Sequence, residues 1–344
     1  MADVHRINFE PVDIEMEVRE DENILDAAFR QGIHLMHGCR EGRCSACKSF
    51  VLDGDVQMAG HSTFACNDAE ADEGFVLLCR THAYSDATIE LLNFDTDELL
   101  GGLPIQNVRT RITALHSMTR DIVSLRLEAI EPAAFEFKPG QYVDIHLPGS
   151  DEHRSFSMAG TQAAPGQLEF LIKKYPGGRF AALLEDGLAV GDELSITGPY
   201  GTSTLKDGHV LPVVCVAGGA GMAPILSLLR HMSETGCTRP VRFYYGARTA
   251  ADLFYLDEIA RVGAGLRDFT FTPCLSESLA EAPDAAVAGN VTDVVSAHET
   301  DIARTEVYLC GPPPMVDAAL ALLDSRSVPT DQVFYDKFTS PAFD

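Results

Sequence analysis

The first hundred residues carry two kinds of apolar pattern. Apolar and polar positions alternate over residues 4–9 and 12–18, which predicts a β-hairpin. Over residues 24–31 the apolar side chains fall on one helical face, which predicts a helix. Further short strands are expected near residues 49–56, 75–79 and 88–92. A small α+β domain is therefore expected over residues 1–98, followed by a linker over the acid- and glycine-rich run from Asp95 to Gly102.

Strand signals follow one another between residues 104 and 207. Six alternating runs are separated by turn residues, at 107–115, 121–129, 141–147, 155–159, 167–174 and 192–197. One helix is expected near Arg179 to Glu185. Short strands at this spacing are typical of a small antiparallel barrel, so the second domain is expected to be all-β.

Strands alternate with helices from residue 208 to residue 344. Strands are expected at 212–217, 241–246, 268–274 and 305–310, with helices at 223–233, 251–262, 291–298 and 313–324. This alternation predicts a parallel sheet covered by helices, a Rossmann-like α/β domain. The uncharged run from Val210 to Leu229 has the length of a membrane span, but its glycines and prolines favour a buried strand, a tight turn and a helix start. The chain is thus expected to be a multidomain protein with α+β, all-β and α/β parts.

Composition and charge narrow the classes of partner. The 344 residues are 46% hydrophobic and 22% charged, which is typical of globular domains and excludes a disordered or fibrous chain. With 51 acidic and 26 basic residues the formal net charge is -25, which argues against nucleic acid or an anionic membrane as a partner. Residues 1–100 alone hold 21 acidic and 7 basic residues. That excess fits either a docking surface for a basic partner or a solvated face that maintains solubility, and the sequence leaves both open.

The beginning of the chain alternates charged and apolar residues and contains no apolar signal segment, so a cytoplasmic protein is expected. In that compartment the nine cysteines are expected to be metal ligands or core residues rather than disulfides.

Four cysteines have the spacing of an iron-sulfur site. Cys39, Cys44 and Cys47 form C-x4-C-x2-C, and Cys79 follows after 31 intervening residues. This is the plant-type 2Fe-2S ferredoxin spacing, in which four thiolates converge on two irons. Zinc sites more often take their ligands as two close pairs in sequence, so the spacing favours the iron-sulfur cluster.

Other sulfur and imidazole groups of this region do not fit the spacing. Cys66 lies off the pattern and is expected in the core. His34, His37 and His61 are expected to be loop or satisfied core histidines rather than Rieske-type ligands, because four thiolates already complete the ligand set.

Two segments of the expected barrel suit a flavin nucleotide. They are Arg154-Ser155-Phe156-Ser157 and the run from Lys173 to Phe180, which contains Gly177 and Gly178. An arginine, hydroxyls, an aromatic ring and a glycine helix start can bind a pyrophosphate and cover a planar ring system. Taken alone, the first segment is weak evidence, because such a run is more often an ordinary amphipathic strand.

The last domain carries a second phosphate-binding pattern. Gly218-Gly219-Ala220-Gly221-Met222-Ala223-Pro224 follows a strand and opens a helix, and Cys310-Gly311-Pro312 ends another strand at the same expected edge. Arg248 is a candidate cation near the coenzyme ribose. Asp252 would repel a 2'-phosphate and no second base follows before Arg261, so NADH is expected rather than NADPH.

These segments, in this order, resemble the ferredoxin-NADP reductase superfamily, whose flavin motif is Arg-x-Tyr/Phe-Ser. The resemblance implies FAD, with Arg154 on its phosphates, Phe156 against the isoalloxazine and Ser157 near N5. It also implies that Gly178 and the helix after it bind the pyrophosphate, and that Cys310 helps to place the nicotinamide. Phe338 is a candidate flavin contact by position, although an ordinary edge strand explains it nearly as well. Phe156, Ala181 and Ala220 depart from the more frequent Tyr, Ser and Thr, which weakens the expected polar contacts with the cofactors.

With the cysteine-rich domain in front, the chain resembles the NADH-dependent reductase components of bacterial multicomponent oxygenases. The closing Tyr335-Asp336-Lys337-Phe338 looks most like those of soluble diiron monooxygenases of the methane and propane type, with the propane type nearest. This resemblance implies electron transfer from NADH through FAD and a 2Fe-2S cluster to the hydroxylase component of a monooxygenase. The alternatives are the reductase of a ring-hydroxylating dioxygenase and a redox-sensing regulatory subunit.

Overall fold

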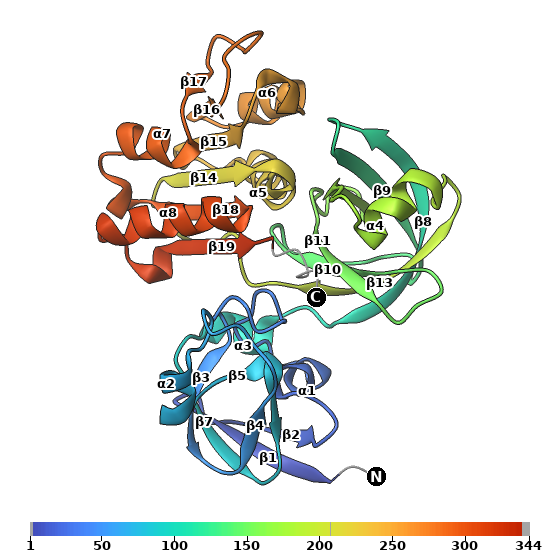
Figure 1. Cartoon of the computed structure of the whole chain (residues 1–344), viewed down its shortest axis with the longest axis vertical. Helices are drawn as coiled ribbons and strands as arrows, with labels where there is room; N and C mark the ends of the chain where they lie inside the picture. The colour runs from blue at the N-terminus through green and yellow to red at the C-terminus, as the bar shows by residue number, and fades with distance from the viewer. Residues whose placement is uncertain (1–2, 207, 339–344) are drawn as a thin grey trace. The chain divides into compact units, whose positions relative to one another are not determined.

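The computed structural model describes residues 3–206 and 208–338. It divides into two compact units, Met1–Ile105 and Gln106–Asp344. The second unit contains both the barrel and the parallel sheet (Figure 1). Among the described residues, no helix combines the length and the apolar character that a membrane crossing requires.

The first unit is a five-stranded mixed sheet with a helix packed on it, the β-grasp arrangement (Figure 1). The sheet order is β2-β1-β7-β3-β5, and β1 pairs antiparallel with β2 but parallel with β7. The strands are β1 (Val4–Glu10), β2 (Ile14–Arg19), β3 (Lys48–Asp53), β5 (Phe75–Leu77) and β7 (Ala87–Leu91). A separate two-stranded ladder joins β4 (Val56–Met58) to β6 (Thr81–Ala83). The predicted hairpin and the α+β class are confirmed.

Helix α1 (Ile24–Arg30) forms where the apolar face predicts it. The side chain of Asn23 caps its first turn by accepting a hydrogen bond from the amide of Asp26 at 2.9 Å. Ile24 and Leu25 are fully buried against the sheet. Burial of this face is the main source of stability for so short a helix.

The segment expected to be a linker is instead a helix, α3 (Thr96–Gly101). Leu99 is only 1% exposed, and its carbonyl accepts a hydrogen bond from the amide of His34 at 2.9 Å. The linker prediction rested on acids and glycines and was wrong, because it missed one apolar side chain that packs into the first unit.

The barrel contains all six predicted strands in the order β11-β10-β13-β8-β9-β12, with every neighbouring pair antiparallel. They are β8 (Gln106–Ser117), β9 (Ile122–Glu131), β10 (Tyr142–His146), β11 (His153–Ser157), β12 (Gln167–Lys173) and β13 (Glu193–Tyr200). A bridge between Met158 and Phe170 brings the end of β11 to β12 and closes the barrel. Helix α4 (Arg179–Asp186) begins at the predicted glycine pair.

The nucleotide domain is a six-stranded parallel sheet in the order β17-β16-β15-β14-β18-β19. Its strands are β14 (Val213–Gly218), β15 (Val241–Ala247), β16 (Phe269–Leu275), β17 (Val287–Ala288), β18 (Glu306–Gly311) and β19 (Val333–Lys337). Its helices are α5 (Met222–Glu234), α6 (Leu256–Ala264), α7 (Val291–His298) and α8 (Pro313–Ser325). Helices α5 and α6 cover one face, and α7 and α8 cover the other (Figure 1). The predicted α/β class is confirmed.

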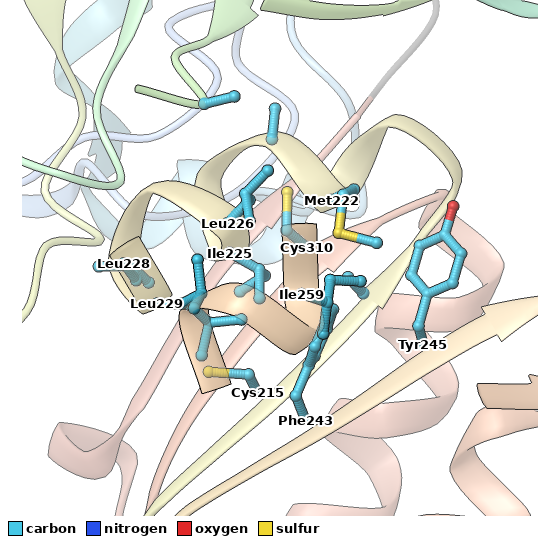
Figure 2. Close-up of a cluster of buried hydrophobic side chains, with 14 of the residues drawn as sticks. Cys215, Met222, Ile225, Leu226, Leu228, Leu229, Phe243, Tyr245, Ile259 and Cys310 are labelled. Atoms are coloured by element: carbon cyan, nitrogen blue, oxygen red, sulfur yellow. The ribbon is translucent and has the colours of Figure 1, made fainter. Parts of the chain in front are cut away.

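A buried cluster joins α5 and α6 to the sheet. Figure 2 shows Leu226 and Leu229 of α5 above Cys215 of β14 and Phe243 of β15, with Ile259 of α6 beside them. The order of the strands reverses beside β14, where β15 lies on one side and β18 on the other. In open α/β sheets, ligands bind outside the carboxyl ends of the strands at this point of reversal.

Candidate functional site

The four spaced cysteines lie together as two pairs. The thiols of Cys39 and Cys44 are hydrogen-bonded to each other, and the sulfurs of Cys47 and Cys79 are 3.4 Å apart. The charge of Cys39 also acts on Cys47 and Cys79, so the two pairs are electrostatic neighbours. Cys47 and Cys79 are almost completely buried.

The loop around these cysteines points backbone amides at the sulfurs. The amides of Glu41 and Arg43 donate to Cys39 Sγ at 3.4 and 3.2 Å, and the amide of Cys39 donates to Cys44 Sγ at 3.2 Å. The hydrogen bond from Cys44, together with these amides, lowers the pKa of Cys39 to about 6. Amides directed at sulfur stabilise thiolates, the form in which cysteine binds metal.

The loop needs unusual backbone conformations to do this. Arg40, Gly42 and Ser45 all have positive φ angles, between 56° and 73°. A Cβ atom on Gly42 would come within 2.8 Å of the Arg80 side chain. Strained backbone of this kind is concentrated at functional sites, where the surrounding structure holds it in place.

The donor set fits a binuclear iron-sulfur cluster, which needs two thiolates for each iron. Within residues 3–206 and 208–338, no group of three or more Cys, His, Asp or Glu side chains is arranged to hold one metal ion. Cys39 with Cys44, and Cys47 with Cys79, give the two thiolates that each iron of such a cluster requires. Cys39, Cys44, Cys47 and Cys79 are the residues that would hold the cluster.

The histidines near the loop have other partners. His37 Nδ1 lies 2.7 Å from the carbonyl of Leu35, and burial lowers the pKa of this imidazole to about 3. Both ring nitrogens of His61 lie 3.1 Å from backbone carbonyls, and His34 is buried. Cys66 is fully buried, as expected of a core residue. These groups satisfy packing and hydrogen bonding within the domain.

Strand β11, at one end of the sheet order of the barrel, carries the predicted flavin motif. Arg154 and Arg179 both form ion pairs with the carboxylate of Glu152, and Arg179 is the first residue of α4. The distance from Arg154 Nη2 to Glu152 Oε2 is 3.2 Å. Ser155 Oγ donates a hydrogen bond of 2.6 Å to the buried carboxylate of Asp144 on β10. Two arginines that meet one carboxylate beside a helix N-terminus can also hold a diphosphate, because both anions take the same donors.

The remaining predicted flavin residues lie along the same part of the barrel. The ring of Phe156 is half-buried, with its centroid 4.8 Å from that of Phe180, and Ser157 is 4% exposed. Gly177 has a φ of +74° and Gly178 is the N-cap of α4. Lys173 Nζ lies 3.5 Å from Asp121 Oδ2. The cationic, hydroxyl and ring groups required for FAD are thus present.

A cleft of about 460 Å³ lies where the barrel meets the carboxyl edge of the parallel sheet. The barrel contributes Asp121 and Lys173 to its wall, and the sheet contributes Gly218, Arg248 and Pro312 among others. The cleft therefore occupies the point of reversal of the sheet, the expected position of a dinucleotide. It brings the predicted flavin residue Lys173 and the predicted coenzyme residues together.

The glycine turn and the end of β18 are in close contact beneath this cleft. A Cβ atom on Gly221 would lie 2.1 Å from the carbonyl oxygen of Cys310, so only glycine fits where α5 begins. Cys310 itself is 1% exposed and packs in the cluster that Figure 2 shows, where Met222 is also drawn. Burial raises the pKa of its thiol, which favours the neutral form. Gly218, Gly219 and Pro312 line the cleft, whereas Cys310 lies below the surface.

The other residues considered for cofactor contact in this region lie outside the cleft wall. Met222, Ala223 and Pro224 are buried in the first turn of α5. Gly311 has a φ of +155° and accepts a hydrogen bond at its carbonyl from the amide of Phe338 at 3.1 Å. Phe338 is half-buried against the cluster of Figure 2. It therefore lies next to the segment predicted to contact the nicotinamide.

The structure adds one base that sequence reasoning missed. Asp252 lies 3.5 Å from Arg248, as the spacing suggests, but also 3.8 Å from Arg120 in the turn between β8 and β9. The sequence holds no second base between Arg248 and Arg261, and the structure supplies one from outside that segment. Arg120 is more than 120 residues away in the chain and belongs to another domain, so no local pattern pointed to it.

Comparison with known protein families gives three matches in chain order. Residues 7–84 match the 2Fe-2S iron-sulfur cluster binding domain, residues 109–204 the oxidoreductase FAD-binding domain and residues 215–320 the oxidoreductase NAD-binding domain. The chain thus uses a 2Fe-2S cluster, FAD and NADH, as the sequence predicts.

Similar proteins cover the whole chain. The reductase component of propane 2-monooxygenase from Mycolicibacterium goodii is 74% identical over 100% of both chains. The electron transfer component of toluate 1,2-dioxygenase from Pseudomonas putida is 32% identical over 93% of this chain and 94% of that protein. Among solved structures, the Amycolatopsis cytochrome P450 reductase GcoB has a TM-score of 0.86 and 28% identity, covering 98% of this chain and 99% of that chain.

The three domain matches agree with the cysteine pairs, the flavin strand and the cleft in the order in which the chain presents them. The chain therefore belongs to the family of oxygenase reductase components that join a 2Fe-2S domain, an FAD-binding domain and an NAD-binding domain, and within it to the propane 2-monooxygenase reductases.

Proposed function

We propose that this chain supplies electrons from NADH to the hydroxylase component of a propane-type monooxygenase with a diiron centre. The observation that carries the proposal is the cleft, whose wall combines the barrel residue Lys173 with the coenzyme turn at Gly218 and Gly219. A cleft shared in this way can bring a nicotinamide to a flavin. The closing segment from Tyr335 to Phe338 supports the diiron class by its resemblance to such reductases.

The residues of the barrel would hold FAD by charge and shape. Arg154 and Arg179 would take the diphosphate in place of Glu152, together with the amides at Gly177 and Gly178. Phe156 would lie against the ring system, while Ser155 stays bound to Asp144 and keeps β11 in register with β10. Ser157, buried at the end of β11, would donate its hydroxyl proton near N5.

The residues of the nucleotide domain would orient the coenzyme. Gly218 and Gly219 leave room for its pyrophosphate, and Pro312 lines the nicotinamide end of the cleft. Cys310 would set the depth of the nicotinamide pocket through its neutral, buried thiol and its contact with Gly221. Arg248 would lie beside the adenosine ribose. Flavins take up two electrons as a hydride and release them singly, whereas a 2Fe-2S cluster carries one electron at a time.

Domain bounds of 1–98, 104–207 and 208–344 accompany the proposal, with α3 attached to the first domain. We also propose a cytoplasmic location, which the nine free cysteines support because a reducing compartment keeps thiols unpaired.

The experiment is reconstitution with alternative partners. The purified chain, loaded with FAD and its cluster, is combined with the oxygenase component of a propane 2-monooxygenase or of a toluate 1,2-dioxygenase, and oxidation of each substrate by NADH is measured. We expect turnover with the propane enzyme and at most about one tenth of that rate with the dioxygenase. Equal or greater turnover with the dioxygenase would favour the alternative reductase.

A regulatory sensor would behave differently from either reductase. Steady-state oxidation of NADH with a one-electron acceptor separates the two classes, because a sensor needs only a single turnover. Sustained turnover is the expected result, and a reaction that stops after one equivalent of NADH would contradict the proposal.

A further inference from the structure

A buried carboxylate lies where the barrel packs against the nucleotide domain. Glu169 on β12 is 7% exposed, and within the barrel it accepts hydrogen bonds from Ser124 at 3.3 Å and from two nitrogens of Arg126 at 3.2 Å. From the nucleotide domain it accepts a hydrogen bond from Arg230 Nη1 at 2.7 Å and one from the Tyr255 hydroxyl at 2.6 Å. One carboxylate therefore collects donors from both domains.

Arg230 on α5 makes several hydrogen bonds at this interface. Besides Glu169, its guanidinium donates to the carbonyl of Ala159 at 2.9 Å and to Glu258 on α6 at 2.7 Å. Its side chain is 14% exposed, so these charge-assisted hydrogen bonds form largely out of water. A planar guanidinium with three partners in different elements fixes their relative positions more firmly than an apolar contact of equal area.

Helix α5 has two more polar anchors on the barrel. Ser227 Oγ donates to the carbonyl of Gly160 at 2.5 Å, and Thr161 Oγ1 donates to Glu234 at 2.8 Å. Residues 159–161 lie just after the flavin strand β11, one residue beyond its end, and α5 begins at the coenzyme turn. The helix therefore connects the two predicted cofactor sites through a short path of hydrogen-bonded residues.

Tyr255 connects the same carboxylate to the start of α6. It is a non-glycine residue with φ +57° at the start of α6, a conformation that persists only when its surroundings hold it. Its hydroxyl is held by Glu169, and it lies three residues after Asp252 of the cleft wall. Burial would raise the pKa of Glu169, but Arg230 and Tyr255 outweigh burial and lower it, so the carboxylate stays charged near neutral pH.

We propose that Glu169 and Arg230 are positioning residues that fix the coenzyme turn relative to the flavin strand, and so set the rate at which NADH reduces the flavin. The inference rests on the proposed function. Neither residue lines the cleft, so their effect passes through α5 and the segment from Ala159 to Thr161. A displacement of about 1 Å between reacting groups can lower a rate by one to two orders of magnitude.

The test compares Arg230→Met with Arg126→Met in the FAD-loaded chain. Both substitutions remove an arginine from Glu169, but Arg126 lies on β9 and reaches the nucleotide domain at the Tyr255 hydroxyl. Arg230 lies on α5 and also binds the Ala159 carbonyl and Glu258, so only its loss releases α5 from the segment after the flavin strand. Anaerobic rapid mixing with NADH gives the limiting rate of flavin reduction and the NADH concentration at half that rate. We expect Arg230→Met to lose at least about tenfold in the limiting rate with half-saturation within about twofold, and Arg126→Met to stay within about twofold in both.

Two further measurements separate positioning from general damage. Arg230→Lys keeps the charge and is expected to recover part of the rate, which guards against a Met variant that folds poorly. Amide hydrogen exchange without NADH should rise over residues 222–234 in Arg230→Met but not in Arg126→Met. A normal limiting rate in Arg230→Met, or equal losses in both methionine variants, would overturn the inference. A wild-type chain that NADH cannot reduce would refute the proposed function instead, and the exchange comparison would still decide whether Arg230 fixes the helix.

Discussion

Asp252 is the residue whose charge we expect to decide which nicotinamide coenzyme the cleft accepts. It lies between Arg120 and Arg248 and neutralises both. Asp252→Asn keeps an oxygen that accepts the hydrogen bonds from Thr249 but removes the negative charge, which leaves two arginines for a 2'-phosphate. We expect kcat/KM for NADPH to rise about tenfold relative to NADH in steady-state dye reduction.

The matched control for this change is Asp257→Asn, an exposed acid in the first turn of α6. It should leave the ratio of the two coenzymes unchanged. If Asp252→Asn leaves that ratio unchanged as well, Asp252 does not face the ribose and the assignment of this wall is incorrect.

Glu152 is a second acidic residue whose charge we expect to affect cofactor binding, because it competes with the FAD diphosphate for two arginines. Because its carboxylate occupies Arg154 and Arg179, Glu152→Gln should free both for the diphosphate and lower the Kd for FAD about threefold to tenfold. Arg154→Gln should raise the Kd at least about tenfold. Equilibrium binding of FAD to the flavin-free chain measures both, with Glu185→Gln, which pairs only with Lys174 among the described contacts, as the control. Weaker binding in Glu152→Gln would show that Glu152 orders the arginines rather than competes for them.

At the scale of elements, long strands and helices with a regular apolar pattern could be predicted from the sequence, whereas short elements could not. The six barrel strands, and four strands and three helices of the nucleotide domain, appear within a few residues of their expected bounds. The helix expected over residues 251–262 begins only at Leu256. The sequence prediction missed α2 (Asp68–Glu73), which has no buried residue, and β17, which has only two residues. Elements like these form because neighbours and caps support them, so their own sequence carries little signal.

Helix α3 gives a prediction for this scale. A Cβ atom on Gly102 would lie 2.1 Å from the buried ring of His34, whereas one on Gly101 would have nothing within 4 Å. Gly102→Ala should therefore destabilise the first unit by about 1–3 kcal/mol, and Gly101→Ala should have little effect. Urea unfolding followed by the visible circular dichroism of the cluster reports this unit alone. Equal midpoints for the two variants would mean that α3 is not packed on His34 in solution.

At the scale of the molecule, the sequence located the chemistry of each domain but not the contacts between domains. The cysteine spacing and the glycine turns are motifs that can be recognised within one domain. In the structure the cysteines lie together in pairs, and the glycines form the tight turn that the sequence predicts. Arg120 beside Asp252 and Arg230 beside Glu169 join residues more than 60 positions apart. Such pairs depend on how two finished domains pack, which a single sequence does not reveal.

The uneven charge of the chain gives a prediction about its partner. Residues 1–100 hold 21 acidic and 7 basic residues, and the cysteine pairs lie in the same unit. If this unit docks on a basic surface of the oxygenase, raising the salt concentration from about 0.05 to about 0.5 M should slow oxygenase reduction about tenfold. Reduction of a small uncharged dye should change little over the same range. A salt-independent rate with the oxygenase would leave the acidic excess as a solubility feature.

The central claim, that electrons pass from NADH through the flavin and leave through the cysteine-bound cluster, is tested most directly by Cys44→Ser with Cys66→Ser as its control. Cys44 belongs to one of the two sulfur pairs, whereas Cys66 is buried in the same unit with its thiol at the carbonyls of Asn67 and Phe75. We predict that Cys44→Ser keeps NADH oxidation with a dye that accepts electrons at the flavin but loses at least about 90% of NADH-driven oxygenase turnover, while Cys66→Ser retains both. Full oxygenase turnover in Cys44→Ser would contradict the account.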